Sequence, residues 1–207
     1  MADKTRFFKP GLKSPDFETE EQLATEQTLG RIKTKLDNPL ATKGIIKSVG
    51  VRKVLIAAAD YAAEDVLSEN ATTGNSWAFN GVVLQKGGSG YITKAQALCS
   101  TTALTPRLTL YLFTAVPTSA LADNGANTAV LAADVAKYVG KIDFPAMEDL
   151  GGFSETLVSP STTGNLPLGF TCAGDSDTLY GILVTRDAIA GEAALMTMTV
   201  ILGIEQY

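Results

Sequence analysis

The stretch that most constrains the fold is Arg107–Phe113, which reads Arg-Leu-Thr-Leu-Tyr-Leu-Phe. Leucine occupies every second position, at Leu108, Leu110 and Leu112, and more polar residues fall between the leucines. Successive side chains of an extended chain point to opposite faces, so this alternation puts the leucines together on one face. The stretch therefore predicts a β-strand with one face in a core and the other in solvent.

Eight further stretches combine apolar alternation or an apolar run with turn residues at their ends. They are Val51–Ala59, Asp65–Ser68, Trp77–Gln85, Tyr91–Leu104, Tyr138–Phe144, Leu166–Cys172, Thr178–Arg186 and Ala193–Gly203. In the last of them, Met196, Met198, Val200 and Leu202 share one face and are expected in the core. About nine short strands with no fixed repeat are typical of an antiparallel β-sandwich that is jelly-roll-like.

The connections between the strands leave room for little else. Thr128 is expected to cap a short helix over Ala129–Lys137, and Pro145–Asn165 is expected to be mostly loop because glycine and proline interrupt it. We thus predict a mainly β protein with an extended N-terminal arm and at most one or two short helices.

The first 50 residues differ from the rest of the 207-residue chain. They carry 9 Lys/Arg and 7 Asp/Glu, a balance of +2, whereas residues 51–207 carry the remaining 8 and 15, a balance of −7. We predict an arm over residues 1–50, with a helix over Phe17–Leu36, and a β-sandwich domain over residues 51–207. The opposite charges would favour contact between the arm and a neighbouring copy, and the acidic body disfavours nucleic acid as a partner.

Seven apolar residues of the arm are the candidate partner-binding residues. Two adjacent phenylalanines suit a segment that becomes ordered against a partner better than one that stays in water. The predicted helix adds a narrow apolar stripe, which needs something to pack on. The candidates are Phe7, Phe8, Phe17, Leu23, Leu29, Ile32 and Leu36.

Catalytic chemistry is hard to find in this sequence. The chain has no histidine, which excludes Ser-His-Asp and Cys-His catalysis and removes the commonest transition-metal ligand. The stretch Lys86–Gly90 is followed by Tyr91-Ile92 and not by the lysine and hydroxyl of a phosphate-binding loop, so a hairpin connection is expected there. Leu121–Asn127 lacks the spacing of a calcium loop. Glu148, Asp149 and Glu155 lie in a stretch expected to be solvated loop, so a paired-carboxylate site is disfavoured. We expect no enzyme, no cofactor and no bound metal.

Cysteine use and apolar runs bear on where the protein is made. Cys99 and Cys172 both lie in strand-like apolar stretches and are expected to be buried, reduced thiols, although the sequence leaves a disulfide open. The N-terminus carries no apolar signal segment, and no run of 18 apolar residues occurs. We expect a soluble protein made in the cytoplasm, with no membrane partner.

The order of several short motifs resembles that of virion proteins of tailed bacteriophages. The motifs are Ala59-Asp60-Tyr61-Ala62-Ala63-Glu64-Asp65-Val66, Gly88-Ser89-Gly90-Tyr91-Ile92-Thr93-Lys94-Ala95, Leu110-Tyr111-Leu112-Phe113, Leu121-Ala122-Asp123-Asn124 and Leu179-Tyr180-Gly181-Ile182-Leu183-Val184. The resemblance covers residues 51–207. It is to the head decoration (cement) proteins of these phages, which coat the lattice of the major capsid protein.

The resemblance implies a β-sandwich that binds the capsid exterior as a homo-oligomer, either a dimer or a trimer, with the major capsid protein as its partner. It carries over no catalytic residue. One alternative is a fibre, tail or receptor-binding domain that recognises host surface glycans, for which exposed aromatics such as Trp77 or Tyr111 would be the signal. A β-sandwich hydrolase is a further alternative that the missing histidine disfavours.

Overall fold

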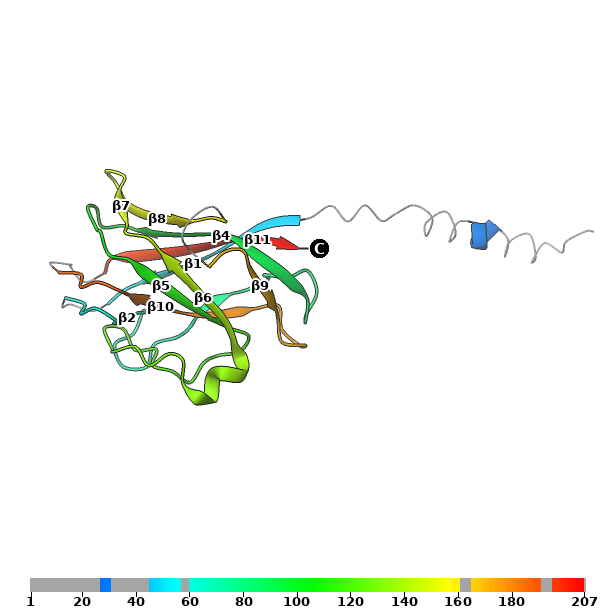
Figure 1. Cartoon of the computed structure of the whole chain (residues 1–207), viewed down its shortest axis with the longest axis horizontal. Helices are drawn as coiled ribbons and strands as arrows, with labels where there is room; N and C mark the ends of the chain where they lie inside the picture. The colour runs from blue at the N-terminus through cyan, green and yellow to red at the C-terminus, as the bar shows by residue number, and fades with distance from the viewer. Residues whose placement is uncertain (1–26, 31–44, 57–59, 161–164, 191–194, 207) are drawn as a thin grey trace, which may run out of the picture. The chain divides into compact units, whose positions relative to one another are not determined.

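Two antiparallel sheets make up the part of the chain that begins at residue 45 (Figure 1). The computed structural model describes residues 27–30, 45–56, 60–160, 165–190 and 195–206. Residues 44–207 form one compact unit and residues 1–43 another, of which 27–30 are described. Sheet I contains β1 (Ile45–Val54), β4 (Ser89–Cys99), β7 (Glu148–Asp149), β8 (Ser154–Val158), β9 (Leu168–Thr171) and β11 (Thr197–Gln206). Sheet II contains β2 (Val66–Leu67), β3 (Trp77–Phe79), β5 (Leu108–Phe113), β6 (Tyr138–Phe144) and β10 (Leu179–Thr185).

The strands pair in the order of a jelly roll. If β2 and β3 count as one interrupted strand and the short β7 and β9 are set aside, the first strand pairs with the last and the second with the second-last. Likewise β4 pairs with β8, and β5 pairs with β6. The resulting sheet orders are β1-β11-β4-β8 and β2-β10-β5-β6. This nested pairing of eight strands in two sheets confirms the predicted fold class.

Several predicted boundaries and connections differ from the structure. The first strand begins at Ile45, so residues 45–50 belong to the sheet and not to the arm. Pro145–Asn165 was expected to be mostly loop but contains β7 and β8, whose alternation is short and interrupted by Gly151-Gly152. Among the described residues from 45 to 206, the one helix is the 3-10 helix η1 (Ala132–Lys137). Thr128 does not cap it, because its hydroxyl accepts the Ala120 amide at 2.7 Å.

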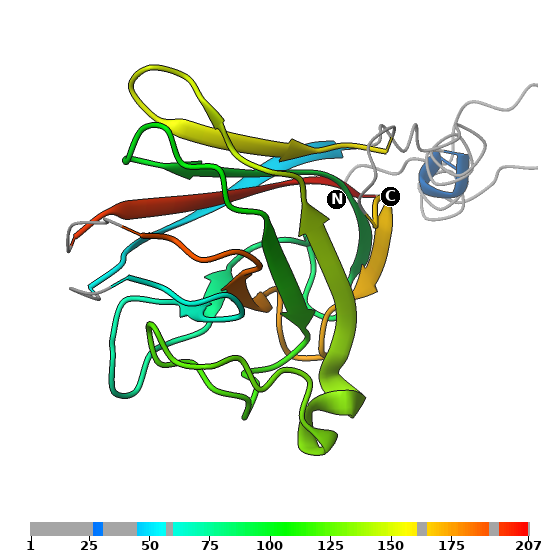
Figure 2. The ribbon, with the colours of Figure 1, turned by 60° about the vertical axis from the view of Figure 1, so that its left-hand side comes forward.

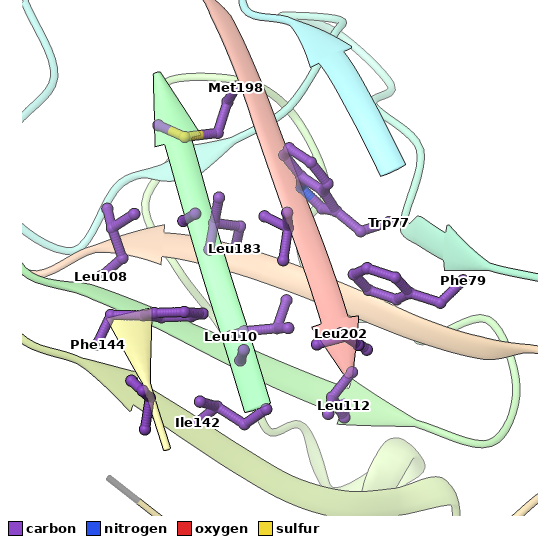
Figure 3. Packing of buried hydrophobic residues seen from close by; sticks show 14 of the residues in the cluster. Trp77, Phe79, Leu108, Leu110, Leu112, Ile142, Phe144, Leu183, Met198 and Leu202 are labelled. Carbon is purple, nitrogen blue, oxygen red and sulfur yellow. The ribbon is translucent and has the colours of Figure 1, made fainter. Parts of the chain in front are cut away.

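The main core lies between the two sheets (Figure 3). Leu108, Leu110 and Leu112 of β5 face inward as predicted, and each is fully buried. They meet the inward face of β11, where Met198, Val200 and Leu202 are buried as predicted, as is Met196 just before the strand. Both cysteines are buried thiols that are not part of a disulfide, and burial raises the pKa of Cys172 to about 11. The inward residues of both sheets, which occur at every second position of the strands, therefore form one apolar layer between the sheets.

The outward face of sheet II is also covered, which the sequence did not predict. The excursion over residues 114–137 folds across it beside β6 (Figure 2). A second apolar cluster forms beneath the excursion from Val66, Phe113, Ile182 and Val184, with Tyr111 and Leu121 packed against it. The strand over Leu108–Phe113 is consequently buried on both faces along most of its length, and Thr109 is 1% exposed.

One buried carboxylate holds the excursion in place. Asp134 of η1 is fully buried, and its oxygens accept hydrogen bonds from the backbone amides and hydroxyls of Thr118 and Ser119 at 2.8 to 3.0 Å. Burial alone would raise the pKa of Asp134, but these four donors outweigh it and lower the pKa to about 2. The charged form is therefore the one that the fold requires.

We predict that Asp134→Asn destabilises the protein in a pH-dependent way. The folded-state pKa lies below the unfolded value, so the stabilisation is complete above about pH 4 and disappears as pH falls toward 2. The expected loss in unfolding free energy at pH 7 is about 2 kcal/mol, and it should shrink toward zero near pH 2. Denaturant unfolding at both pH values measures this difference. Asp175→Asn, at an exposed loop carboxylate, is the matched control; an equal loss for Asp134→Asn at both pH values would contradict the assignment.

Candidate binding surface

Most of the predicted partner-binding residues lie outside the described residues. Phe7, Phe8, Phe17, Leu23, Ile32 and Leu36 are in this group. Leu29 is described: it lies in the helical turn over residues 27–30, and its side chain is 57% exposed. This turn falls within the helix predicted over Phe17–Leu36. The apolar stripe itself stays a prediction.

Within the sandwich, the outward face of sheet I is the broad surface that the described residues leave open. It is built by the residues that alternate with the core positions of β1, β11, β4 and β8. Cross-strand registers arrange them in rows, of which two are Arg52-Thr199-Leu98-Glu155 and Gly50-Ile201-Gln96-Leu157. Ile46, at the start of β1, is 77% exposed, and Leu157 of β8 is 42% exposed. We call this surface, Ile46 to Val54 on one edge and Phe153 to Leu157 on the other, the sheet I face.

β1 is the edge strand of sheet I and pairs with β11 over ten residue pairs. Two of its lysines point inward, toward the loops of the other sheet. Lys47 donates to the carbonyl of Gly81 at 2.6 Å, and Lys53 is 8% exposed. Inward charges of this kind discourage a further strand from pairing with an exposed edge. A partner is therefore better accommodated on the sheet I face than along the β1 edge.

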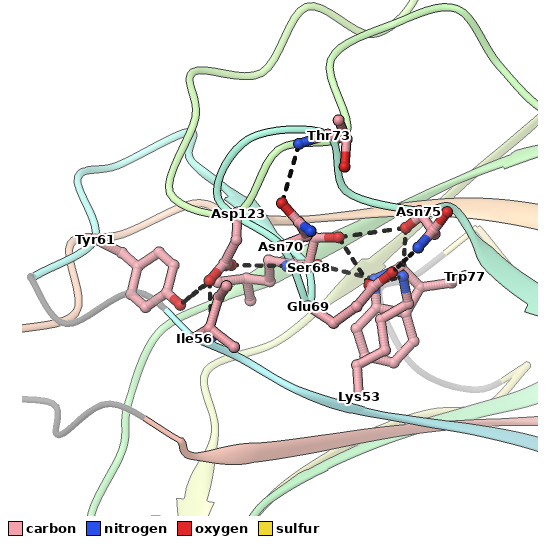
Figure 4. Close-up of polar contacts among 11 residues, drawn as sticks. Lys53, Ile56, Tyr61, Ser68, Glu69, Asn70, Thr73, Asn75, Trp77 and Asp123 are labelled. Carbon is pink, nitrogen blue, oxygen red and sulfur yellow. Dashed lines mark hydrogen bonds and ion pairs between the residues drawn. The ribbon is translucent and has the colours of Figure 1, made fainter.

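Lys53 of β1 is the buried member of a polar cluster that also contains the partly exposed Glu69 and the exposed Asn75 (Figure 4). Its ammonium forms an ion pair with Glu69, donates to the carbonyl of Asn75 and lies 5.4 Å from the centre of the Trp77 ring. The indole of Trp77 in turn donates to the carbonyl of Leu67 at 2.9 Å. These contacts fix the 69–76 loop against the sandwich.

The charges of this cluster are unequally stabilised. Burial lowers the pKa of Lys53, although the hydrogen bond and charge of Glu69 oppose the shift. Burial acts to raise the pKa of Glu69, but hydrogen bonds from Lys53 and Asn75 outweigh it and lower that pKa. The pair is thus a structural ion pair. Its loss removes the charged partner of Glu69 and one of the donors to the Asn75 carbonyl, while Ser68 and Asn75 still donate to the Glu69 carboxylate.

Asp123 fixes the same region from the excursion (Figure 4). Its carboxylate accepts the amide of Ser68 at 2.8 Å, the amide of Ile56 at 3.0 Å and the hydroxyl of Tyr61 at 3.0 Å. Gly74 makes the close approach of the two loops feasible, since its φ is +52° and a Cβ there would lie 1.6 Å from the Leu121 carbonyl oxygen. The Asp123 carboxylate oxygens, which belong to the stretch considered as a calcium loop, therefore accept hydrogen bonds from N–H and O–H donors.

The structure also shows where the carboxylates considered for a paired-carboxylate site and the aromatics considered for glycan binding lie. Glu148 and Glu155 are brought opposite each other on β7 and β8, which the sequence missed because it assigned them to a loop. Trp77 is 1% exposed and cannot offer a ring to a glycan, which corrects the expectation, and Tyr111 is partly buried beneath the excursion. Across the described ranges, no group of three or more His, Cys, Asp or Glu residues could hold a metal ion.

A groove beside β4 and β9 was not foreseen. It has a volume of about 470 Å³ and is lined by Ser89, Gly90, Tyr91, Gly169, Phe170 and Thr171. The Tyr91 ring is 46% exposed and packs beside Gly169, where a Cβ would lie 3.2 Å from the ring. Because Gly169 has no side chain, it leaves the space that the Tyr91 ring occupies beside the groove.

Comparison with known proteins adds little. No family model matches the chain, and no curated protein matches it. Among solved structures, the chain is similar to one from a full particle of Israeli acute paralysis virus heated to 63 degrees, with 14% identity and a TM-score of 0.28 over 78% of this chain and 71% of that one. A TM-score of 0.28 is too low for any functional argument. In the described residues, no helix has the length and apolar character needed to span a bilayer.

We predict that the Lys53–Glu69 pair contributes measurably to stability. Lys53→Met keeps the aliphatic stem beside Trp77 but removes the donor, and we expect a loss of about 1 to 3 kcal/mol in unfolding free energy. Glu69→Gln should cost less, because Glu69 is partly exposed. The double variant should lose less than the sum of the two single losses in a double-mutant cycle. Lys86→Met, at an exposed loop lysine, is the control, and strict additivity would contradict the coupling.

Proposed function

We propose that this protein is a structural virion protein that binds the outside of a phage capsid lattice. In this proposal it performs no reaction, and it stabilises the shell by bridging subunits of the major capsid protein. The observation that carries the proposal is the jelly-roll pairing of β1 with β11 and of the strands nested within that pair. Viral capsid domains and lectin domains are built on this fold. The step from fold to function is an analogy, supported by the sequence resemblance to decoration proteins.

The arm supplies the bridging contact in this proposal. It precedes β1 directly, and its apolar residues Phe7, Phe8 and Phe17 suit a segment that becomes ordered against a neighbouring subunit. Each such contact is weak alone. Repetition over a lattice raises the effective concentration of every further contact, so many copies together hold the shell firmly.

We predict that deleting residues 1–40 separates folding from capsid binding. The truncated protein keeps the whole of β1, which begins at Ile45, and should remain folded and soluble. It should no longer saturate capsids that lack the native protein. Occupancy is measured by cosedimentation and by electron microscopy of the particles.

A full-length Phe7→Ser/Phe8→Ser variant is the milder companion to the deletion. It should lower occupancy without changing the circular dichroism of the sandwich. Full occupancy by the truncated protein would refute the role of the arm. No binding of the full-length protein to capsids would refute the proposed function itself.

Glycan recognition is the second candidate, and the groove at Tyr91 is the observation that favours it. The exposed ring offers a stacking surface beside the hydroxyls of Ser89 and Thr171, which lie 2.9 Å apart. If this candidate holds, a glycan array gives specific signals that Tyr91→Ala abolishes while capsid binding is unchanged. For a protein that acts on the lattice alone, we expect no signal from either form.

A further inference from the structure

The sheet I face carries opposite charges on its two edges, and they are too far apart to meet within one chain. Arg52 on β1 and Glu155 on β8 belong to the same cross-strand row, separated by β11 and β4. Three inter-strand steps put them about 14 Å apart. In the described part of the chain Arg52 forms no ion pair, and its guanidinium donates one 3.4 Å hydrogen bond to Thr197.

The acidic edge carries a local conflict. Glu148 and Glu155 are direct cross-strand partners on β7 and β8, so their side chains share one face. Like charges directly opposite each other destabilise a strand pair. Glu155 accepts a hydrogen bond from the Gln96 amide, whereas the Glu148 side chain has no hydrogen bond or ion pair to the described residues. A cation placed over this edge would relieve the repulsion.

We infer that the sheet I face is the contact of a two-fold homodimer of this protein. This inference rests on the proposed function, for which it names the homo-oligomeric contact, and it is testable on the free protein. The axis runs parallel to the strands, between β11 and β4, in the plane of the interface. Rotation about it lays β1 of one copy over β8 of the other and keeps every residue in its own row.

The rows become complementary under this rotation. Arg52 lies opposite Glu155 of the second copy, and each dimer contains this contact twice. Gly50 has no side chain outside Cα, and it lies opposite Leu157, whose exposed side chain needs room. The same rotation lays the end of β1 over the start of β8, so Val54, 41% exposed, meets Phe153, which directly precedes β8 and is 48% exposed. A single two-fold axis therefore produces the charged pair of Arg52 and Glu155, the space at Gly50 for Leu157, and the apolar contact of Val54 with Phe153.

The size and composition of the face suit a dimer of moderate affinity. Three strands of about ten residues and the five-residue β8, spaced about 4.8 Å apart, cover roughly 550 Å². That is somewhat less than the approximately 800 Å² per partner of a standard interface. Leu98 and Ile201 lie at the centre, with threonines and charges around them, which is the usual mixture for a non-obligate contact.

Charge reversal at the two edges tests the inference. In Arg52→Glu protein, residues 52 and 155 are both acidic, and in Glu155→Arg protein both are basic, so each variant should dimerise at least about tenfold more weakly than the native protein. An equimolar mixture of the two variants should form a heterodimer, because each acidic position then meets a basic one. Sedimentation equilibrium of the full-length proteins at low salt measures all three cases. Lys86→Glu is the control with the same change in charge as Arg52→Glu, and it should dimerise as the native protein does.

The possible outcomes are distinct from those of the capsid test. Weakened single variants and a restored mixture support the two-fold contact. A native protein that is monomeric at about 100 μM, a dimer indifferent to both substitutions, or a mixture that fails to associate would each overturn it. Native dimers that fail to bind capsids would leave this inference intact and refute the proposed function.

Discussion

The pairing of β1 with β11 is the constraint on which the other features of the sandwich depend. Ten consecutive residue pairs join the first strand to the last, and β11 pairs on its other side with β4. β1, β11 and β4 therefore lie side by side, and their inward side chains together face sheet II, where they pack against the leucines of β5. Because β1 pairs on one side only, it is an edge strand of sheet I. Its inward lysines discourage another strand from pairing with that edge. Its outward residues form one margin of the sheet I face.

The sequence allowed the sandwich to be predicted because its signal is local. The alternation at Leu108, Leu110 and Leu112, and at Met196 to Leu202, depends only on the two faces of a strand. The structure confirmed both sets as core. What the pattern could not give is the cover on the outward face of sheet II, because Thr109 and Tyr111 look polar whether water or an excursion lies over them. Tertiary packing from residues 114–137 decided it.

The surfaces were harder to predict than the core. β7 and β8 were missed because the period is short and glycines interrupt it, and so Glu148 and Glu155 were not recognised as neighbours. Trp77 was offered as an exposed ring, but an indole with a buried hydrogen-bond acceptor and a lysine over its face belongs inside. Rows across a sheet join residues about 50 to 150 positions apart, so Arg52 and Glu155 share a row that no sequence window contains.

The nested pairing also sets the order in which the chain can become stable. β5 and β6 are near neighbours in sequence, but Ile45 and Gln206 pair across some 160 intervening residues. Contacts of such long range slow folding, because the entropy of closing the loop is lost before the contacts between the two strands stabilise the chain. During synthesis the first strand stays without its partner until almost the whole chain has left the ribosome. The inward lysines of β1 therefore matter most before the native state exists, while the unpartnered first strands of newly made copies can still pair with one another.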